Sequence, residues 1–305
     1  MRHFDAQATR ERLGFDALIA ALERMFVDGC EAPPRHVHEV GGELATLIMP
    51  AWQAGRYLGI KTVHVAPGNA ARGLPSVHAS YQLFDARTGV PLALIDGNEL
   101  TARRTAAASA LAASRLARTD ARRLVVVGAG AVAALLPHAH ARVRAIEHVD
   151  VWARRPEAAT ALAARLRAEG LPAHAAGELA SAVAAADIVS CATLAAEPLV
   201  RGEWLRPGVH LDLVGSFTPS MREADDACFA GAQVWVDTDD ASKKSGELLA
   251  PLASGALAPT QLRGTLRELC TMGAPARNPQ ARTIFKSVGT ALEDLAAAIL
   301  VHEAG

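Results

Sequence analysis

The chain has 305 residues, of which half are hydrophobic and about a fifth are charged, and its formal net charge at pH 7 is −1. This balance argues against a surface for nucleic acid or anionic membrane, and the length suits two domains or one large one. Four cysteines without a C-x-x-C pair favour neither a zinc site nor a disulfide framework, and they fit a reducing cytoplasm.

The N-terminal hundred residues predict one helix followed by strands. The polar start, MRHFDAQATRERLG, gives no indication of a secretory signal, and no stretch of the chain is apolar enough to span a membrane. Residues 15–28 place Leu18, Leu22 and Met25 on one helical face, which predicts an amphipathic helix. Strands are predicted for three later segments: 59–65, 78–85 and 90–96.

A strand that ends in glycines follows, within RRLVVVGAGAVAALLPHAH. Four apolar residues at 124–127 suit a buried parallel strand, and Gly128, Gly130 and Ala133 complete a G-x-G-x-x-A pattern. In such a turn the first glycine allows a tight bend, the second lets the backbone approach a pyrophosphate at a helix N-terminus, and the small third residue lets helix and strand pack closely. The pattern predicts a dinucleotide site; a glycine turn without a ligand is the alternative.

The rest of the chain predicts alternating strands and helices. Pro137 should kink or shorten the helix after the glycines. A second strand, 148–152, is followed by Arg154 and Arg155 instead of the acid that bonds the ribose of NAD, so NADP(H) is predicted. The alternative is that these arginines lie on a solvated loop. A doubly wound parallel sheet is completed by a helix at 157–169 and strands at 187–193, 209–215 and 233–238, and the tail from residue 283 predicts a turn followed by a helix.

Three cationic side chains, Lys61, Arg103 and Arg104, are placed where they favour a site for an anion. A long alanine-rich helix is predicted from about residue 102 to 118, with Thr101 as its N-cap. Arg103 and Arg104 would then lie in its first turn, where the macrodipole disfavours a cation by about 0.3–1 kcal/mol, unless they reach solvent or a neighbouring acid. Lys61 shares a strand face with apolar residues and needs a partner, unless it is an edge-strand lysine. The arginines could grip a carboxylate.

Other candidate cations and metal ligands are less specific. Arg35, after two prolines, is a third cation that by itself indicates nothing. His36 and His38 share a strand face, but two imidazoles without a third ligand do not predict a metal site. His138 and His140 face apart on a helix, so no metal is expected.

Four stretches resemble the ornithine cyclodeaminase and mu-crystallin family, in the right order over nearly the whole chain: LTARRTAAASALAASRLAR, VVVGAG, LVGSFTPSMREADD and TIFKSVGTALED. The resemblance implies an α/β fold in which a Rossmann doubly wound sheet, residues 119–284, is inserted into an α+β substrate-binding and dimerisation domain, residues 1–118 plus 285–305. It also implies a homodimer. Arg35, Lys61 and Arg104 match the family's substrate-carboxylate cluster, which leaves Arg103 dispensable.

The expected site follows from the motif and the resemblance together. Lys61 and Arg104 are expected to be catalytic, with Lys61 as proton donor if one is needed, since nearby arginines lower its pKa. Ser287 and Gly289 match a loop near the substrate. The expected cofactor-binding residues are Gly128, Gly130, Ala131, Ala133, Arg154, Arg155, Thr193, Val214, Gly215 and Val288.

Phe217 bears on the type of reaction. Cyclodeaminases have an aspartate at the matching position, and a phenyl ring cannot accept a proton. GSFTPSMRE resembles the family's reductase branch, which acts on cyclic ketimino acids such as Δ1-pyrroline-2-carboxylate and Δ1-piperideine-2-carboxylate. We therefore expect reduction to proline or pipecolate with NADPH preferred and NADH as a second cofactor. The alternatives are an alanine-dehydrogenase-type or ornithine-cyclodeaminase-type enzyme, or a non-enzymatic mu-crystallin-like protein that binds NADPH and a ligand.

Overall fold

The computed structural model describes residues 1–42, 44–272, 278 and 280–304. The chain divides into two compact units, unit 1 (residues 1–104 and 290–305) and unit 2 (residues 105–289). The expected combination of a doubly wound parallel sheet and a second α+β region is confirmed. The division between the units at residues 104 and 105 falls inside helix α3 (Gly97–Leu116). The boundary predicted at residue 118 lies just after the same helix.

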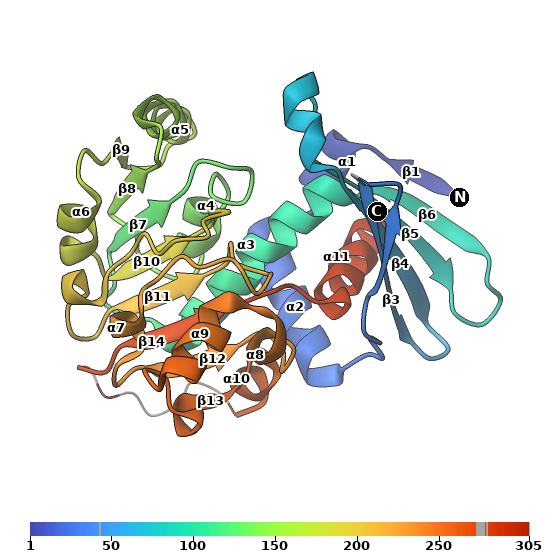
Figure 1. The fold of residues 1–305 in the computed structure, drawn as a ribbon. Helices are drawn as coiled ribbons and strands as arrows, with labels where there is room; N and C mark the ends of the chain where they lie inside the picture. Colours follow the sequence, from blue (N-terminus) through green and yellow to red (C-terminus); the bar gives the residue numbers. More distant parts are fainter. Residues whose placement is uncertain (43, 273–277, 279, 305) are drawn as a thin grey trace. The chain divides into compact units, whose positions relative to one another are not determined.

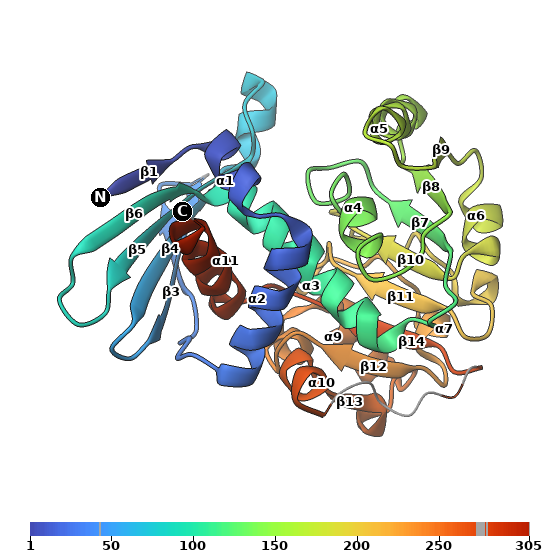
Figure 2. The ribbon, with the colours of Figure 1, turned by 180° about the vertical axis from the view of Figure 1, so that it is seen from behind.

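Unit 1 contains a six-stranded sheet in the order β1-β6-β5-β4-β3-β2, in which β2 to β6 pair antiparallel and β1 pairs parallel to β6. Helix α11 packs on the sheet and against α2 (Figures 1 and 2). The elements are β1 (Arg2–Phe4), α1 (Ala6–Arg12), α2 (Phe15–Asp28), β2 (His36–Val40), β3 (Leu44–Gln53), β4 (Tyr57–Val65), the 3₁₀ helix η1 (Pro67–Arg72), β5 (Val77–Asp85), β6 (Pro91–Asp96) and α11 (Ala291–Glu303).

The helix at residues 15–28 is confirmed as α2, but the start of α3 differs from the prediction. Asp96 Oδ1 accepts the Glu99 N–H at 2.8 Å, so this carboxylate, and not Thr101, caps the first turn. Arg104 therefore lies in the second turn of α3, where the macrodipole is weaker. The helix-end argument for an anion was wrong, and any anion has to be argued from tertiary contacts.

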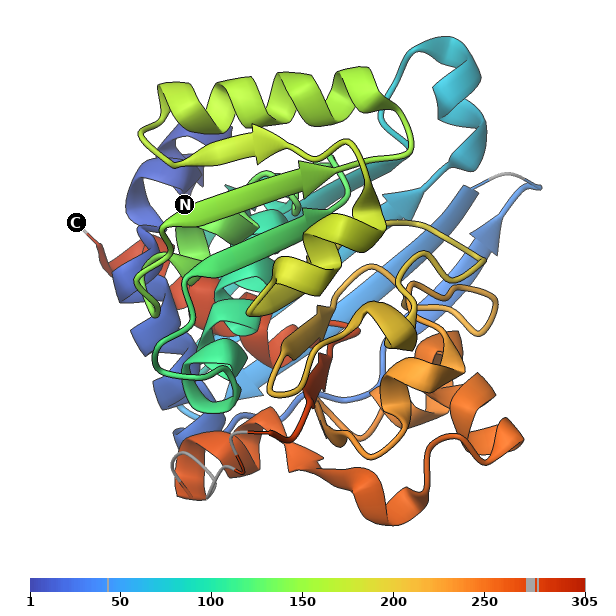
Figure 3. The ribbon, with the colours of Figure 1, turned by 90° about the vertical axis from the view of Figure 1, so that its left-hand side faces the viewer.

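Unit 2 is built on an eight-stranded parallel sheet in the order β13-β12-β14-β11-β10-β7-β8-β9. Figure 3 views these strands with α5 beside β8 and β9. The elements are β7 (Arg123–Val127), α4 (Leu136–His140), β8 (His148–Trp152), α5 (Pro156–Ala168), β9 (Ala173–Ala175), α6 (Leu179–Ala185), β10 (Ile188–Cys191), η2 (Gly202–Trp204), β11 (His210–Leu213), α7 (Asp226–Phe229), β12 (Gln233–Val236), α8 (Ala241–Lys244), α9 (Gly246–Ser254), η3 (Pro259–Gln261), β13 (Leu262–Thr265), α10 (Leu266–Met272) and β14 (Thr283–Lys286).

The order of the strands identifies the ligand-binding edge of this sheet. From β7 the chain runs outward to β8 and β9, then returns to β10 on the other side of β7 and continues to β11. Parallel sheets bind ligands where the strand order reverses in this way, at the carboxyl ends of the strands. The ends of β7 and β10 are therefore the expected place for a ligand.

Two segments of unit 2 differ from the expected pattern. Residues 283–286, predicted as a turn, form β14 between β11 and β12, fully buried; with only two apolar residues, the segment lacks the run that marks a buried strand. The helix after the glycines is short, as Pro137 predicted: α4 has five residues and the proline lies in its first turn. Residues 131–135 form turns instead.

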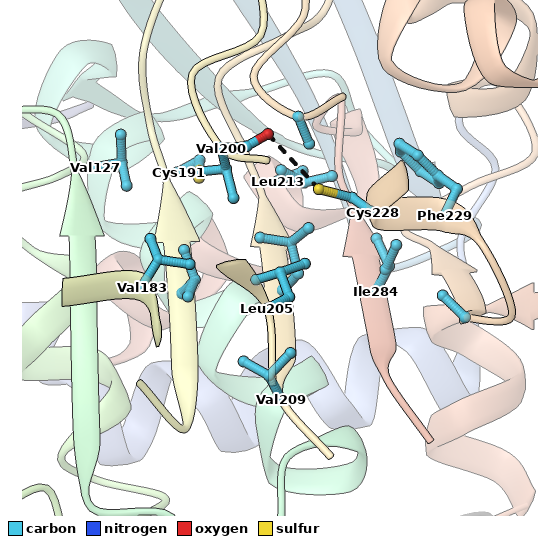
Figure 4. Packing of buried hydrophobic residues seen from close by; sticks show 14 of the residues in the cluster. Val127, Val183, Cys191, Val200, Leu205, Val209, Leu213, Cys228, Phe229 and Ile284 are labelled. Carbon is cyan, nitrogen blue, oxygen red and sulfur yellow. Dashed lines mark hydrogen bonds between the residues drawn. The ribbon is translucent and has the colours of Figure 1, made fainter. Parts of the chain in front are cut away.

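The core of unit 2 fills the space between its sheet and helices. Figure 4 shows Val127, Cys191, Leu213 and Ile284 projecting from four neighbouring strands into one apolar cluster. All four cysteines of the chain are free. Among the described residues, no helix is long and apolar enough to cross a membrane.

Candidate active site

Two buried cations and two buried acids meet in unit 1. Lys61 on β4 is 2% exposed and its Nζ lies 2.6 Å from Asp294 Oδ2. Arg104 on α3 is 5% exposed; its Nε lies 2.8 Å from Asp294 Oδ1, and its Nη1 lies 2.5 Å from Glu293 Oε2. Asp294 thus bridges the two cations. Of the donors of Arg104, Nη2 forms no hydrogen bond with the residues the structure describes.

Local structure explains why these groups face one another. Lys61 lies opposite Met49 and Tyr81 in the sheet, on the face against which α11 packs. Thr290 caps α11 by accepting the Leu292 N–H, so Glu293 and Asp294 fall in the first turn, where the helix dipole favours carboxylates. The helix therefore delivers two oriented acids to the cations.

The charges of the cluster shift one another's pKa values. Burial lowers the pKa of Lys61 to about 8; the charges of Arg104 and Arg35 act in the same direction, and Asp294 opposes them. Burial acts to raise the pKa of Asp294, but Arg104 and Lys61 hold it below its ordinary value. Arg35 and Arg104 thus act in the same direction on the ionisation of Lys61.

Arg103 has a different environment from Arg104. Its Nε donates to the Leu13 carbonyl at 2.8 Å, its guanidinium lies 4.7 Å from the centre of the Phe15 ring, and Glu99 is 3.5 Å away. These are contacts that tie α3 to the start of α2. The alternative that these arginines reach a neighbouring acid is thus correct for both: Arg103 contacts Glu99, and Arg104 contacts Glu293 and Asp294.

The acids were missed by sequence reasoning. Thr290 followed by Glu293 is the T-x-x-E pattern of a capping box, which signals an acidic first turn. That pattern could have located the acids on a helix N-terminus. It could not show that they face Lys61 and Arg104.

The glycine turn in unit 2 fits a phosphate group. Gly128 has φ +124°, and an added Cβ would lie 2.6 Å from the Ala192 carbonyl oxygen, so glycine is required by the protein itself. At Gly130 an added Cβ would meet nothing within 4 Å, so the fold does not explain that glycine and a closely approaching ligand would. Ala133 is buried, as a small packing residue should be.

The N–H groups after the glycines suit an anion although α4 begins only at Leu136. The first helical hydrogen bond runs from the Ala134 N–H to the Gly130 carbonyl, 3.0 Å. The N–H groups of residues 131–133, which include Ala131, donate to no other described residue. The expected helix N-terminus is thus replaced by a turn that offers the same free donors.

The arginines after β8 are exposed. The side chains of Arg154 and Arg155 form no hydrogen bond or ion pair with any described residue. They follow Trp152, which pairs with Val127 at the end of β7. The two guanidinium groups therefore follow the strand that pairs with β7, whose end carries the glycine turn, and both can donate hydrogen bonds to an anion.

The remaining expected residues lie at adjacent strand ends. Thr193 follows β10, Val214 and Gly215 follow β11, and residues 287–289 follow β14, between β11 and β12. The Val214 N–H donates to the Cys191 carbonyl and the Ser287 N–H to the Leu213 carbonyl, at 2.8 and 3.2 Å. Phe217 is 46% exposed in the loop after β11. Within the described residues no group of His, Cys, Asp and Glu is placed to hold a metal ion.

Comparison with known proteins identifies the family of this chain and relatives with named activities. A family model described as ornithine cyclodeaminase/mu-crystallin family matches residues 6–305. A Δ1-pyrroline-2-carboxylate reductase of Paracoccus denitrificans is 45% identical over 80% of this chain and 78% of its own length.

Two solved structures are similar over the whole chain. A Δ1-pyrroline-2-carboxylate reductase of Thermococcus litoralis, in complex with NADH and L-proline, has a TM-score of 0.94 and 32% identity and is covered over 97% of its length. An archaeal alanine dehydrogenase dimer with bound NAD has a TM-score of 0.92 and 28% identity and is covered over 95% of its length.

Proposed function

The chain belongs to the ornithine cyclodeaminase/mu-crystallin family, and from that premise we propose that it is a nicotinamide-dependent reductase of cyclic ketimino acids. Its substrates are Δ1-pyrroline-2-carboxylate, reduced to proline, and Δ1-piperideine-2-carboxylate, reduced to pipecolate. The observation that carries the proposal is the buried pair Lys61 and Arg104, oriented by Asp294 and Glu293. Similarity to the Paracoccus and Thermococcus reductases supports it.

Each cation has a defined role in binding. Arg104 uses Nε and Nη1 to bind the two acids, which leaves Nη2 for the substrate carboxylate. Lys61 and Arg35 complete the carboxylate site. Fixing the carboxylate fixes the C=N carbon of the ring, and such positioning lowers a reaction barrier by several kcal/mol.

Reduction of the C=N bond requires a hydride at carbon and a proton at nitrogen. A bound nicotinamide cofactor supplies the hydride. With a pKa of about 8, Lys61 is mostly protonated at neutral pH and can also give up its proton, so it serves as donor when the imine arrives unprotonated. Phe217, which has no proton-accepting group, favours reduction over cyclodeamination.

Unit 2 binds the cofactor, with NADPH preferred over NADH. Gly128, Gly130 and the free N–H groups of residues 131–133 hold the pyrophosphate, and Thr193, Val214, Gly215 and Val288 line the sheet edge toward the nicotinamide. Arg154 and Arg155, exposed and without an acidic partner among the described residues, bind the 2′-phosphate. The Thermococcus structure contains NADH and gives no support for NADPH. The proposed preference for NADPH therefore depends on these two arginines alone.

Unit 1 binds the substrate through its cation cluster and binds a second copy of the chain; Ser287 and Gly289 are the residues that match the family's substrate loop. The sheet face opposite Lys61 carries half-buried apolar side chains on three neighbouring strands: Ile48, Pro50, Trp52, Leu58, Ile60 and Phe84. A continuous apolar face of this kind marks a protein interface, which supports a homodimer. Four free cysteines support a reducing compartment, the cytoplasm.

The test is consumption of NADPH by the purified protein with each ketimino acid offered separately and NADH as the paired control. Turnover with NADPH, and slower turnover with NADH, is the expected result. Ammonia release and NADPH formation from alanine would instead identify an amino-acid dehydrogenase. Saturable NADPH binding without turnover of any imino acid would identify a binding protein and overturn the proposed activity.

A further inference from the structure

A fully buried carboxylate, Glu223, joins two loops at the carboxyl edge of the unit 2 sheet. Its Oε1 accepts the N–H and the hydroxyl of Thr193, at 2.6 and 2.8 Å. Its Oε2 accepts the N–H of Gly215 at 2.7 Å. Thr193 follows β10 and Gly215 follows β11, so one side chain holds the ends of two neighbouring strands together.

The two loops are in direct contact under this carboxylate. An added Cβ on Gly215 would lie 1.9 Å from the Thr193 carbonyl oxygen, so nothing larger than glycine fits there. Each loop then exposes an apolar side chain: Leu194 is 74% and Phe217 46% exposed. A change in the separation of the loops would move both side chains.

Glu223 is itself held by other buried charges. Glu247 Oε2 accepts the Glu223 N–H at 2.7 Å and the Ser216 hydroxyl at 3.0 Å. Lys286 Nζ donates to the Leu213 carbonyl at 2.9 Å, and its charge favours ionised Glu223. Burial nevertheless raises the pKa of Glu223 to about 7. Burying an ionised carboxylate costs free energy, which the hydrogen bonds that its oxygens accept from the two loops have to offset.

The hydrogen bonds also decide what the loops can offer a ligand. Both donors of Thr193 and the N–H of Gly215 are used by Glu223. The Thr193 hydroxyl also accepts the Ala195 N–H at 3.3 Å. A cofactor at this edge therefore meets the remaining acceptor capacity of Thr193 and the backbone of Gly215, in positions that the carboxylate fixes.

We propose that Glu223 is the positioning residue of the cofactor edge, which sets the Thr193 and Gly215 loops for the nicotinamide cofactor without touching it. The inference rests on the proposed function, because it takes these loops to be part of the cofactor site. It assigns to Glu223 an effect on cofactor affinity that a residue needed only for folding would not have.

The test compares Glu223→Gln with a matched buried carboxylate at the opposite edge of the same sheet. Glutamine keeps the size but has one accepting oxygen, so it loses the bond to one loop. Asp187, 6% exposed, accepts the N–H groups of Arg122 and Arg123 at 2.9 Å each, at the amino ends of β7 and β10. Both N–H groups share Oδ2, which an asparagine oxygen can replace, so Asp187→Asn keeps this brace and removes the charge that Arg118 and Arg206 contact at Oδ1, away from the expected cofactor.

The measurements are the Kd of NADPH, from fluorescence titration, and the midpoint of thermal unfolding. We expect Glu223→Gln to weaken NADPH binding by about 10- to 100-fold at most, because the energy of one hydrogen bond to a charged group limits what freeing one loop can cost. The loss should enter KM for NADPH more than kcat at saturation. Asp187→Asn should lower the unfolding midpoint and leave the Kd unchanged. If Glu223→Gln does not fold, Glu223→Asp, which keeps the charge but cannot reach both loops, should show the same weakening.

Three results would overturn the inference. One is a variant at Glu223 that binds NADPH like the wild type. The second is an equal loss of affinity in Asp187→Asn, because the effect would then follow stability. The third is a wild-type protein that binds neither NADPH nor NADH, which would also overturn the proposed function, whereas the first two leave it intact.

Discussion

Replacing Lys61 with methionine removes one cation from the proposed carboxylate site while filling its volume. Its ammonium lies 2.6 Å from Asp294 Oδ2, and both side chains are buried. A hydrogen bond to a charged group contributes about 1.5–3 kcal/mol, so kcat/KM for the ketimino acid should fall about 10- to 150-fold. The Kd of NADPH should not change, because the proposed cofactor residues lie in unit 2.

The same substitution should have little effect on folding. The difference between a pKa of 10.5 and about 8 for Lys61 corresponds to about 3 kcal/mol against its charged form. Methionine removes that cost, and Asp294 keeps Arg104 as a partner at 2.8 Å. We expect the free energy of unfolding at pH 7 to remain within about 2 kcal/mol of the wild-type value.

The pH dependence gives an independent check. Lys61 is charged below about pH 8 in the folded protein, so wild-type kcat/KM should fall as pH rises through 8. Between pH 8 and 10.5 the unfolded chain binds more protons than the folded one, so this lysine makes the wild type more stable as pH rises. The methionine variant should lack both dependences.

Initial rates from pH 6 to 10, NADPH titration and denaturant unfolding measure these effects on both proteins. A drop in NADPH affinity as large as the drop in kcat/KM would refute the assignment of Lys61 to the substrate. So would a variant whose kcat/KM still fell through pH 8.

Three further predictions concern other parts of the chain. Arg104→Met should lower kcat/KM about 100-fold and destabilise the fold by about 3–5 kcal/mol, because Glu293 and Asp294 each lose a buried cationic contact. Arg103→Met should keep kcat/KM, and equal losses in steady-state assays would contradict the distinction. Gly130→Ala should keep the unfolding midpoint, since its Cβ meets nothing within 4 Å, yet weaken NADPH binding about tenfold by occupying the phosphate space. Ile60→Lys should convert a homodimer to monomer in light scattering, and a retained dimer would exclude that sheet face.

Local patterns determined much of this protein. The amphipathic spacing of residues 15–28 gave α2 with the predicted bounds, because one apolar face is enough to bury a helix. The apolar run before Gly128 and the alternation of strands and helices after it predicted the parallel sheet, which the structure confirms. Pro137 shortened α4 as expected. These features depend on neighbours in the chain, which a sequence displays directly.

Tertiary structure alone decided the chemistry of the cation cluster. Asp294 and Arg104 are 190 residues apart in sequence, and only the packing of α11 on the sheet brings them together. Likewise β14 is a strand because β11 and β12 pair with both its edges, although its own four residues carry a weak pattern. A buried ion pair or a central strand is stabilised by groups that the fold supplies from elsewhere, so its signal is absent from the local sequence.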